Sequence, residues 1–172
     1  LPIGMDHFAL PQDSLTIAAA QGRLHRNFQG YTDDACTTLL GVGASSIGRL
    51  SDGYVQNETA TGNYMRAVAN GQLPVARGIT LTDEDKLHGD IIESLMCRYS
   101  FSISALRADH GSLSDRIVPH IQQALDADPH GLADFDGETF RILPHGHAFV
   151  RTVASWFDTR MKQKQARYSM AV

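Results

Sequence analysis

The sequence predicts an α+β protein in which helices predominate, and three observations support this. Apolar residues recur at helical spacing in the second half, as at Leu87, Ile91 and Leu95. Short apolar runs bounded by glycine, early and late in the chain, are typical of strands. With 172 residues, of which 42% are hydrophobic and 20% charged, the chain is long enough and apolar enough to bury a core.

The first 24 residues predict one buried strand and one helix. Residues 1–4 have the character of the end of a buried strand, and residues 11–21 predict a helix followed by Gly22. Asp6 and His7 are candidates for an acid–base pair. Neighbours in a strand point to opposite faces, so we expect one of them to be a structural hydrogen-bond partner instead.

Residues with binding chemistry are most concentrated between His25 and Gly48. Phe28 can cover an apolar or π surface, and the Gln29 amide both donates and accepts hydrogen bonds. Aliphatic residues up to Ile47 alternate with glycine and serine, so the backbone can approach a ligand closely. These features predict a binding wall. Two short strands with an aromatic residue in the core would give the same pattern, and both interpretations remain open.

The middle of the chain predicts a loop, a brief strand and a helix. The polar stretch 32–38 indicates the loop, and residues 51–55 indicate a strand or turn. Asn57 is a candidate N-cap for a helix over residues 58–70, with Gly71 after its end. Residues 73–81 contain Pro74 and Gly78 and predict an extended connector.

The second half predicts helices around one hairpin. Thr82 and three carboxylates after it predict an N-cap and a solvated first helical turn. The predicted elements are helices at 83–98, 103–110 and 114–127, the last starting closer to Arg116 because of Pro119, then a hairpin at 131–143 and a helix at 144–164.

The order helix, hairpin, helix is that of a winged-helix module, which binds DNA or docks proteins. From residue 83 onward, 10 Lys or Arg oppose 13 Asp or Glu, a net charge of −3, and the whole chain carries −4. Asp134, Asp136 and Glu138 in the wing would repel phosphates. We therefore expect no nucleic-acid partner and favour a lid or docking role.

Composition also limits the location and the metal chemistry. No apolar run approaches the roughly 18 residues of a membrane span, so no membrane partner is expected. The two cysteines, Cys36 and Cys97, favour a reducing cytoplasm. His145 and His147 are two positions apart and do not face one another on a helix, so no metal site is expected. The chain has no initial methionine, and we expect a piece of a longer polypeptide.

The string HRNFQGYT at 25–32, preceded by IGMDHFA at 3–9, closely resembles the oxygen-independent coproporphyrinogen III oxidases, radical S-adenosyl-L-methionine (SAM) enzymes of haem biosynthesis. The likeness continues through 39–47, Gln56 and Asn57, 73–78, 91–97 and 157–159, and so covers most of the chain. One motif is absent. The family's CxxxCxxC motif, which binds a [4Fe-4S] cluster, does not occur, and two cysteines cannot supply three clustered thiolates.

The resemblance implies an oxidoreductase of porphyrin biosynthesis. In that family an iron-sulfur cluster, whose ligands would lie outside this chain, cleaves S-adenosyl-L-methionine to a radical. The radical takes hydrogen from two propionates of coproporphyrinogen III, and decarboxylation gives protoporphyrinogen IX. The implied partners are the remainder of the catalytic barrel and an electron donor protein. The implied fold is the closing part of a partial (β/α) barrel at 1–78, followed by a helical, winged-helix-like domain at 79–172.

The resemblance also assigns three cofactor-binding residues. Gln29 matches a glutamine near the second SAM, Phe28 matches its aromatic neighbour, and Ile47 matches an aliphatic residue that contacts the cluster-bound SAM. None of the three is an acid or base, so we expect no catalytic residue and no metal ligand in this chain, which should be inactive alone. Two alternatives are a haem chaperone of the same superfamily and a non-catalytic winged-helix docking module.

Overall fold

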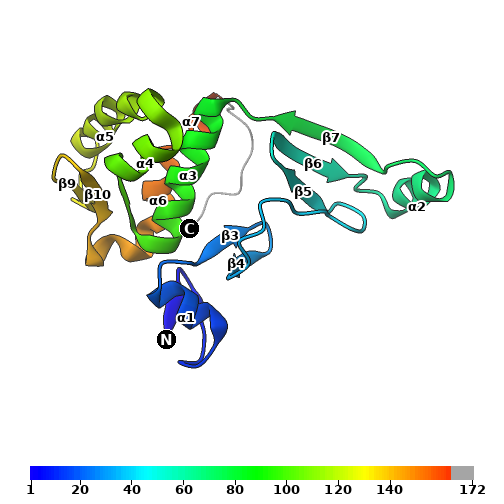
Figure 1. Ribbon diagram of the computed structural model, residues 1–172, viewed down its shortest axis with the longest axis horizontal. Helices are drawn as coiled ribbons and strands as arrows, with labels where there is room; N and C mark the ends of the chain where they lie inside the picture. The colour runs from blue at the N-terminus through cyan, green and yellow to red at the C-terminus, as the bar shows by residue number, and fades with distance from the viewer. Residues whose placement is uncertain (164–172) are drawn as a thin grey trace. The chain divides into compact units, whose positions relative to one another are not determined.

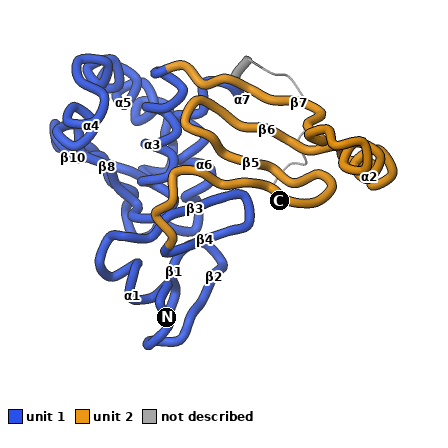
Figure 2. The backbone as a smooth tube through the Cα atoms, turned by 45° about the vertical axis from the view of Figure 1, so that its right-hand side comes forward, with its two compact units in different colours: residues 1–33, 83–172 blue, residues 34–82 orange. Residues whose placement is uncertain are grey.

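The computed structural model describes residues 1–163 and forms two compact units (Figure 2). Unit 1 combines residues 1–33 with the chain from residue 83 onward, and unit 2 is residues 34–82. Unit 2 is therefore an insertion in the sequence of unit 1. The expected division at residue 78 concerns the domains of a longer protein, and it stays a prediction.

Unit 1 begins with two hairpins joined by a helix (Figure 1). Strand β1 (Pro2–Gly4) pairs with β2 (His7–Phe8), and β3 (His25–Asn27) pairs with β4 (Gly30–Thr32), both antiparallel. Helix α1 (Ser14–Ala20) begins after Asp13, whose side chain accepts a hydrogen bond from the Leu15 amide. The buried strand and the helix that the sequence predicts here are confirmed.

The Asp6 and His7 side chains contact each other, with Nδ1 of His7 3.0 Å from Oδ1 of Asp6. The expectation that they point to opposite faces is wrong, because Asp6 lies in the turn between β1 and β2 rather than in a strand. Met5 opens that turn with a φ of 45°. The pair is mostly exposed at the surface.

The rest of unit 1 is a helical module with a small sheet. Its elements are α3 (Asp83–Arg98), β8 (Ser100–Ser102), α4 (Ile103–His110), a 3-10 helix (Gly111–Arg116), α5 (Ile117–Asp126), β9 (Ala133–Phe135), β10 (Thr139–Ile142), a 3-10 helix (Pro144–Phe149), α6 (Val150–Ser155) and α7 (Thr159–Gln163). The predicted bounds of α3 and α4 are confirmed. The sheet is antiparallel with the order β8-β10-β9, and β8 was not expected.

An aromatic cluster forms the centre of this module. Phe101 and Phe140 stack with ring centroids 5.2 Å apart, and Phe157 meets both rings edge-on. Phe140 and Phe157 are fully buried. Leu87, Ile91 and Leu95 of α3 are also fully buried against this cluster, as their helical spacing predicts.

The prediction of a single C-terminal helix at 144–164 is wrong over residues 144–163, which are the part of it that the structure describes. A 3-10 helix and two short α-helices occupy 144–163 instead, and residue 164 lies outside the described part. One local and one long-range set of hydrogen bonds accompanies the break. The Asp158 side chain accepts hydrogen bonds from the amides of Arg160 and Met161, which starts a new helix, while His120 binds the Trp156 carbonyl at 2.9 Å.

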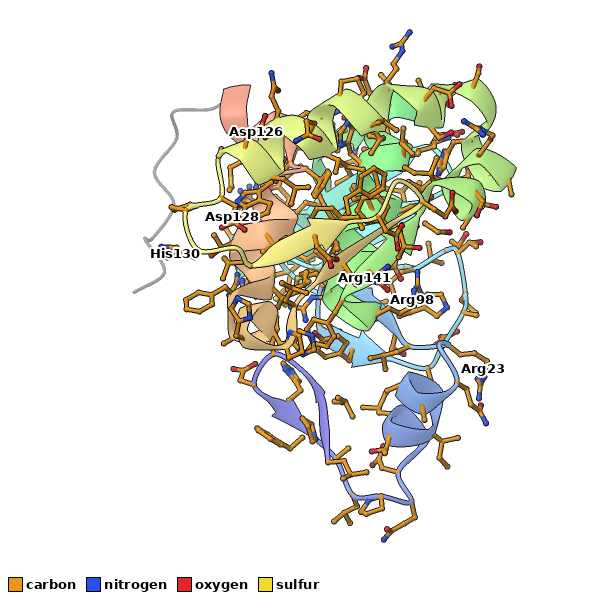
Figure 3. All side chains as sticks on the ribbon, turned by 90° about the vertical axis from the view of Figure 1, so that its left-hand side faces the viewer. Arg23, Arg98, Asp126, Asp128, His130 and Arg141 are labelled. Atoms are coloured by element: carbon orange, nitrogen blue, oxygen red, sulfur yellow. The ribbon has the colours of Figure 1, made fainter. Side chains whose placement is uncertain are left out.

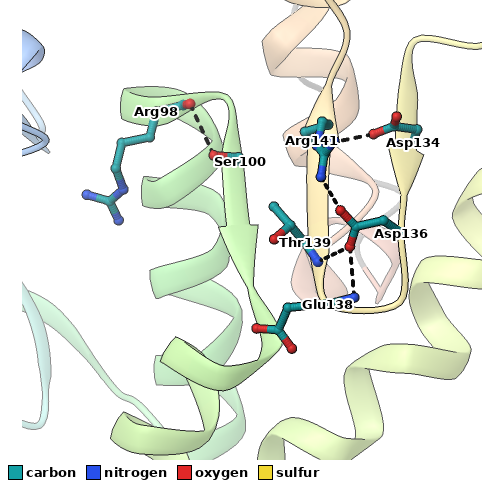
Figure 4. Close-up of polar contacts among 7 residues, drawn as sticks. All are labelled: Arg98, Ser100, Asp134, Asp136, Glu138, Thr139 and Arg141. Carbon is teal, nitrogen blue, oxygen red and sulfur yellow. Dashed lines mark hydrogen bonds and ion pairs between the residues drawn. The ribbon is translucent and has the colours of Figure 1, made fainter.

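Carboxylates shape both ends of the β9–β10 hairpin. Asp128 and His130 lie between α5 and β9 (Figure 3). The Asp128 side chain accepts hydrogen bonds from the amides of His130 and Leu132. At the hairpin turn Asp136 accepts from the amides of Glu138 and Thr139 and pairs with Arg141 (Figure 4). These amide hydrogen bonds lower the pKa of Asp136. The acidic wing side chains are therefore engaged in internal bonds.

Unit 2 is a three-stranded antiparallel sheet with one helix. Strands β5 (Ile47–Leu50), β6 (Gly53–Asn57) and β7 (Val75–Thr80) lie in the order β5-β6-β7, and α2 spans Thr61–Ala69. One expectation is wrong here and another is confirmed in part. Asn57 ends β6 and does not cap the helix, which follows Ala60 without a side-chain cap. The expected extended conformation of residues 73–81 is confirmed at 75–80, but these residues pair with β6 as a strand and are not a connector.

Candidate functional site

Phe28 and Gln29 form the two-residue tip of the β3–β4 hairpin. Asn27 and Gly30 close the tip as paired residues, and Gly30 has a φ of 145°, which favours glycine. The Asn27 side chain accepts a hydrogen bond of 2.8 Å from the Gln29 amide. Phe28 is 55% exposed and Gln29 is also exposed. Residues 25–32 thus form two short strands, as the alternative to a binding wall predicted. Phe28, however, lies outside the core, which that alternative did not predict.

Both strands of this hairpin are fastened to α3. Nδ1 of His25 lies 2.9 Å from Oε1 of Glu93, and the Tyr31 hydroxyl donates to the Met96 carbonyl at 2.9 Å. The Arg26 guanidinium lies 4.9 Å from the centre of the Tyr31 ring. Burial is the main reason why the pKa of Tyr31 is raised. Each strand of the hairpin is therefore bonded to α3.

Sequence reasoning assigned no role to Glu93 or Met96. The available signal was a carboxylate within the mostly buried stretch 91–97 of α3. A buried or half-buried carboxylate needs a partner, which predicts a contact but not its identity. His25 was expected to open the binding wall, and the structure gives it a hydrogen-bonding partner on α3.

Ile47 begins β5 of unit 2, directly after residues 41–46, which we call the glycine–serine ribbon. Asn57 supports this ribbon, because its buried side-chain amide donates to the carbonyls of Gly41 at 2.9 Å and Gly43 at 3.0 Å. The Gly43 amide in turn donates to the Tyr64 hydroxyl. Ile47 is half-buried. The glycines were predicted to let the backbone approach a ligand closely. In the structure the backbone at Gly41 and Gly43 instead contacts other residues of unit 2.

The three predicted cofactor-binding residues belong to different units. Phe28 and Gln29 are in unit 1, and Ile47 is in unit 2. Their meeting at one ligand therefore stays a prediction. A hollow of about 450 Å³ in unit 1 involves none of them; its lining includes His120, Trp156 and Met161.

The tip residues have the chemistry to hold S-adenosyl-L-methionine. Within residues 1–163 the Gln29 side chain makes no hydrogen bond, and Phe28 exposes more than half of its surface. An amide and an aromatic ring can bind the polar edge and the π face of an adenine.

The cysteines, in contrast, do not fit an iron-sulfur cluster. Cys36 is exposed and Cys97 is buried, both as free thiols. Burial, followed by the nearby Glu93 carboxylate, raises the pKa of Cys97 to about 11, whereas cluster ligation needs thiolates. Among the described residues no three His, Cys, Asp or Glu side chains come together as a metal site.

His145 and His147 each have a separate contact. Nε2 of His145 lies 3.0 Å from the Gly131 carbonyl, and His147 stacks on Tyr99 with ring centroids 3.8 Å apart. These contacts explain both histidines as structural residues. Over the described part of the chain, no helix has the length and apolar character to cross a bilayer.

Curated relatives match nearly the whole chain. An oxygen-independent coproporphyrinogen III oxidase of Cereibacter sphaeroides is 46% identical over 169 residues, which are 98% of this chain and 37% of that protein. A protein of the same name from Bradyrhizobium diazoefficiens is 39% identical over 99% of this chain and 38% of its own length. The chain thus spans little more than a third of these relatives. No family model matches it.

A solved structure has the same fold. Coproporphyrinogen III oxidase (HemN) from Escherichia coli, described as a radical SAM enzyme, aligns with a TM-score of 0.83 and 35% identity over 91% of this chain and 36% of that one. The matched region is the C-terminal part of the relatives. On this evidence the chain belongs to the family of oxygen-independent coproporphyrinogen III oxidases, whose C-terminal part it matches.

Proposed function

We propose that this chain is part of an oxygen-independent coproporphyrinogen III oxidase, which oxidatively decarboxylates two propionates of coproporphyrinogen III to the vinyl groups of protoporphyrinogen IX. The observation that carries the proposal is the 46% identity to such an enzyme over 98% of this chain. In addition, the string HRNFQGYT at 25–32 forms a hairpin with an aromatic residue and an amide at its tip. The activity belongs to the complete protein.

Residues of this chain would bind and orient cofactor. Gln29 would hydrogen-bond the polar edge of a second SAM, Phe28 would cover its π face, and Ile47 would contact the cluster-bound SAM. When bound, SAM and the [4Fe-4S] cluster supply the one-electron chemistry that removes hydrogen from the substrate. The protein adds orientation and exclusion of water. The cluster ligands would come from other parts of the protein, since the two cysteines present do not fit that role.

The helical module of unit 1 would cover the active site. Its elements α3, β8, α4, α5, β9 and β10, with the sheet order β8-β10-β9, support a winged-helix-like arrangement. Its wing carboxylates are bonded to Arg141 and Ser104 rather than offered to a partner, and the net charge is negative, which favours a cover over nucleic-acid binding. Residues 1–78 would close a partial (β/α) barrel.

The remaining proposals concern location and partners. A cytoplasmic location is consistent with two free thiols, one of them exposed. An electron donor protein would reduce the cluster, and neither a membrane nor a nucleic acid would be a partner.

The test is anaerobic product analysis with the complete protein, reductant, SAM and coproporphyrinogen III. We expect protoporphyrinogen IX, and haem binding without this product would instead indicate a haem chaperone. Gln29→Ala should lower turnover about tenfold or more with an unchanged melting temperature, because it removes a contact to the ligand and no bond within the described chain. Gln12→Ala, in an exposed loop, is the control. Unchanged turnover in Gln29→Ala would exclude Gln29 from the site.

The isolated 172-residue chain should produce no 5′-deoxyadenosine from SAM under the same conditions, because the cluster is needed for cleavage. Formation of that product by the purified chain would overturn the assignment of the cluster ligands to other polypeptide.

A further inference from the structure

The hairpin that carries Phe28 and Gln29 is bound to helix α3. In the sequence, all of unit 2 lies between the hairpin and this helix. Residues 25–32 and α3 lie in unit 1, although residues 34–82 separate them in sequence (Figure 2). The helical module therefore supports the hairpin directly.

We propose that Tyr31 and Glu93 are positioning residues for the cofactor. They hold the Phe28–Gln29 tip in the orientation that binds S-adenosyl-L-methionine, by fastening each strand of the hairpin to α3. The inference rests on the proposed function and adds to it a structural role for the helical module. Neither residue touches the ligand in this proposal.

Glu93 holds the first strand. Its Oε1 atom lies 2.9 Å from Nδ1 of His25 and accepts a weaker hydrogen bond of 3.4 Å from the Arg26 amide. The Glu93 side chain is 21% exposed, so water competes little for these bonds. One carboxylate oxygen thus binds both a side chain and the backbone of β3.

Tyr31 holds the second strand. Its hydroxyl donates to the Met96 carbonyl, which is among the last four of α3 and so has no amide partner within the helix. Met96 follows Glu93 by three positions, which places the two attachment points on neighbouring turns of one helix face. Two attachments, one per strand, fix the angle of the hairpin as well as its distance from α3.

The Tyr31 ring is itself held from several sides. A Cβ atom built on Gly4 would lie 2.3 Å from the Tyr31 hydroxyl oxygen, so the ring packs directly on the backbone of β1. His7 meets the ring edge-on with centroids 5.1 Å apart, and the Arg26 guanidinium lies over it. The hydroxyl is therefore directed at α3.

These attachments matter because the hairpin is small. Each strand has three residues, and an isolated two-stranded hairpin of this size is marginally stable in water. A displacement of about 1 Å at a reacting or binding group can cost on the order of a hundredfold in rate. The position of the tip must then come from α3 and β1 rather than from the hairpin alone.

The first experiment measures SAM affinity and hairpin protection in the complete protein. Tyr31→Phe and Glu93→Ala should each raise the dissociation constant for SAM by about threefold to tenfold, the effect of losing one hydrogen bond. They should speed hydrogen exchange at the Gln29 and Gly30 amides and leave kcat at saturating SAM less changed than KM. Glu93→Gln retains an acceptor oxygen for His25 and should restore most of the affinity.

A matched control removes the same kind of group elsewhere on α3. Glu84→Ala removes an exposed carboxylate from the first turn of that helix. It should leave SAM affinity and hairpin exchange unchanged. An effect equal to that of Glu93→Ala would overturn the proposal.

The second experiment repeats Tyr31→Phe in a Phe28→Ala/Gln29→Ala background. If Tyr31 acts through the tip, it should have no further effect on SAM affinity there, while the faster exchange persists. An undiminished loss of affinity would show a general structural role and overturn the positioning role. If Gln29→Ala lowers affinity but Tyr31→Phe and Glu93→Ala do not, positioning is wrong and the proposed function stands. If Gln29→Ala has no effect on SAM affinity, the proposed site fails and the positioning role fails with it.

Discussion

Arg160 and Asp85 form a bidentate ion pair, with Nε 2.6 Å from Oδ1 and Nη2 2.6 Å from Oδ2. The two residues are 75 positions apart, and the pair joins α7 to the first turn of α3. The Asp85 side chain is 13% exposed, so the expectation that all three carboxylates of this turn are solvated is wrong for Asp85. A planar guanidinium matches a carboxylate in this geometry, which a lysine does not.

Asp85→Ala should destabilise unit 1 by about 1 kcal/mol or less, because Arg160 is 43% exposed and solvent screens the pair. The loss should shrink at high salt. Thermal unfolding in low and high salt measures this, with Asp83→Ala as control, since it removes an exposed carboxylate from the same turn. Equal losses in the two variants would mean that the ion pair contributes nothing beyond the interaction of a carboxylate with the helix dipole.

Asn57→Ala should destabilise unit 2 by about 1–3 kcal/mol, because the buried amide donates to two carbonyls of the glycine–serine ribbon. Asn57→Asp should be at least as damaging, since a carboxylate cannot donate. Asn63→Ala, on the exposed face of α2, is the control. Urea unfolding followed by circular dichroism gives the free energies, and an unchanged midpoint for Asn57→Ala would contradict this role.

Gly4→Ala should destabilise unit 1 by about 1–3 kcal/mol, because the added Cβ would overlap the Tyr31 ring, whose neighbours leave it little room to move. Gly89→Ala is the matched comparison. An added Cβ at Gly89 meets nothing within 4 Å, and α3 should gain about 0.5–1 kcal/mol from the better helix former. Differential scanning calorimetry should therefore give shifts of opposite sign, and shifts of the same sign would be evidence against the packing described at Gly4.

The two thiols should react at very different rates. Cys36 is exposed, whereas Cys97 is buried and its pKa is raised to about 11. At pH 8 a disulfide reagent should label Cys36 in a fast phase, and Cys97 only as unit 1 opens, because the thiolate is the reactive form. Cys36→Ser should remove the fast phase. A fast phase that survives in Cys36→Ser would show that Cys97 is accessible.

The sequence predicted best where a local signal was strong. Thr82 and the carboxylates after it gave the start of α3, and Gly111 gave the end of α4. The string at 25–32 gave the family and drew attention to Phe28 and Gln29. Prediction was wrong at Asn57 and along 144–163, where a local helix signal is overridden by hydrogen bonds to distant segments.

The candidate site shows the same division. The residue types at Phe28 and Gln29 left a ligand wall and a core aromatic both open, and only the resemblance assigned these residues to the cofactor. The structure decided that Phe28 lies outside the core. The supports at Glu93 and Met96 lie 68 and 65 positions from His25 and Tyr31, and no local pattern marks them as partners.

By itself, the sequence determined the mixed helix-and-sheet class, the bounds of α3 and α4, and the family, and it named three candidate cofactor-binding residues, which stay a prediction. These depend on periodicity, capping and a long specific string, all of which are local. Only the tertiary structure decided that residues 1–33 fold with residues from 83 onward, and that α3 carries the hairpin. Such pairings depend on which distant groups satisfy each other's hydrogen bonds and fill each other's packing space, and chain order does not specify them.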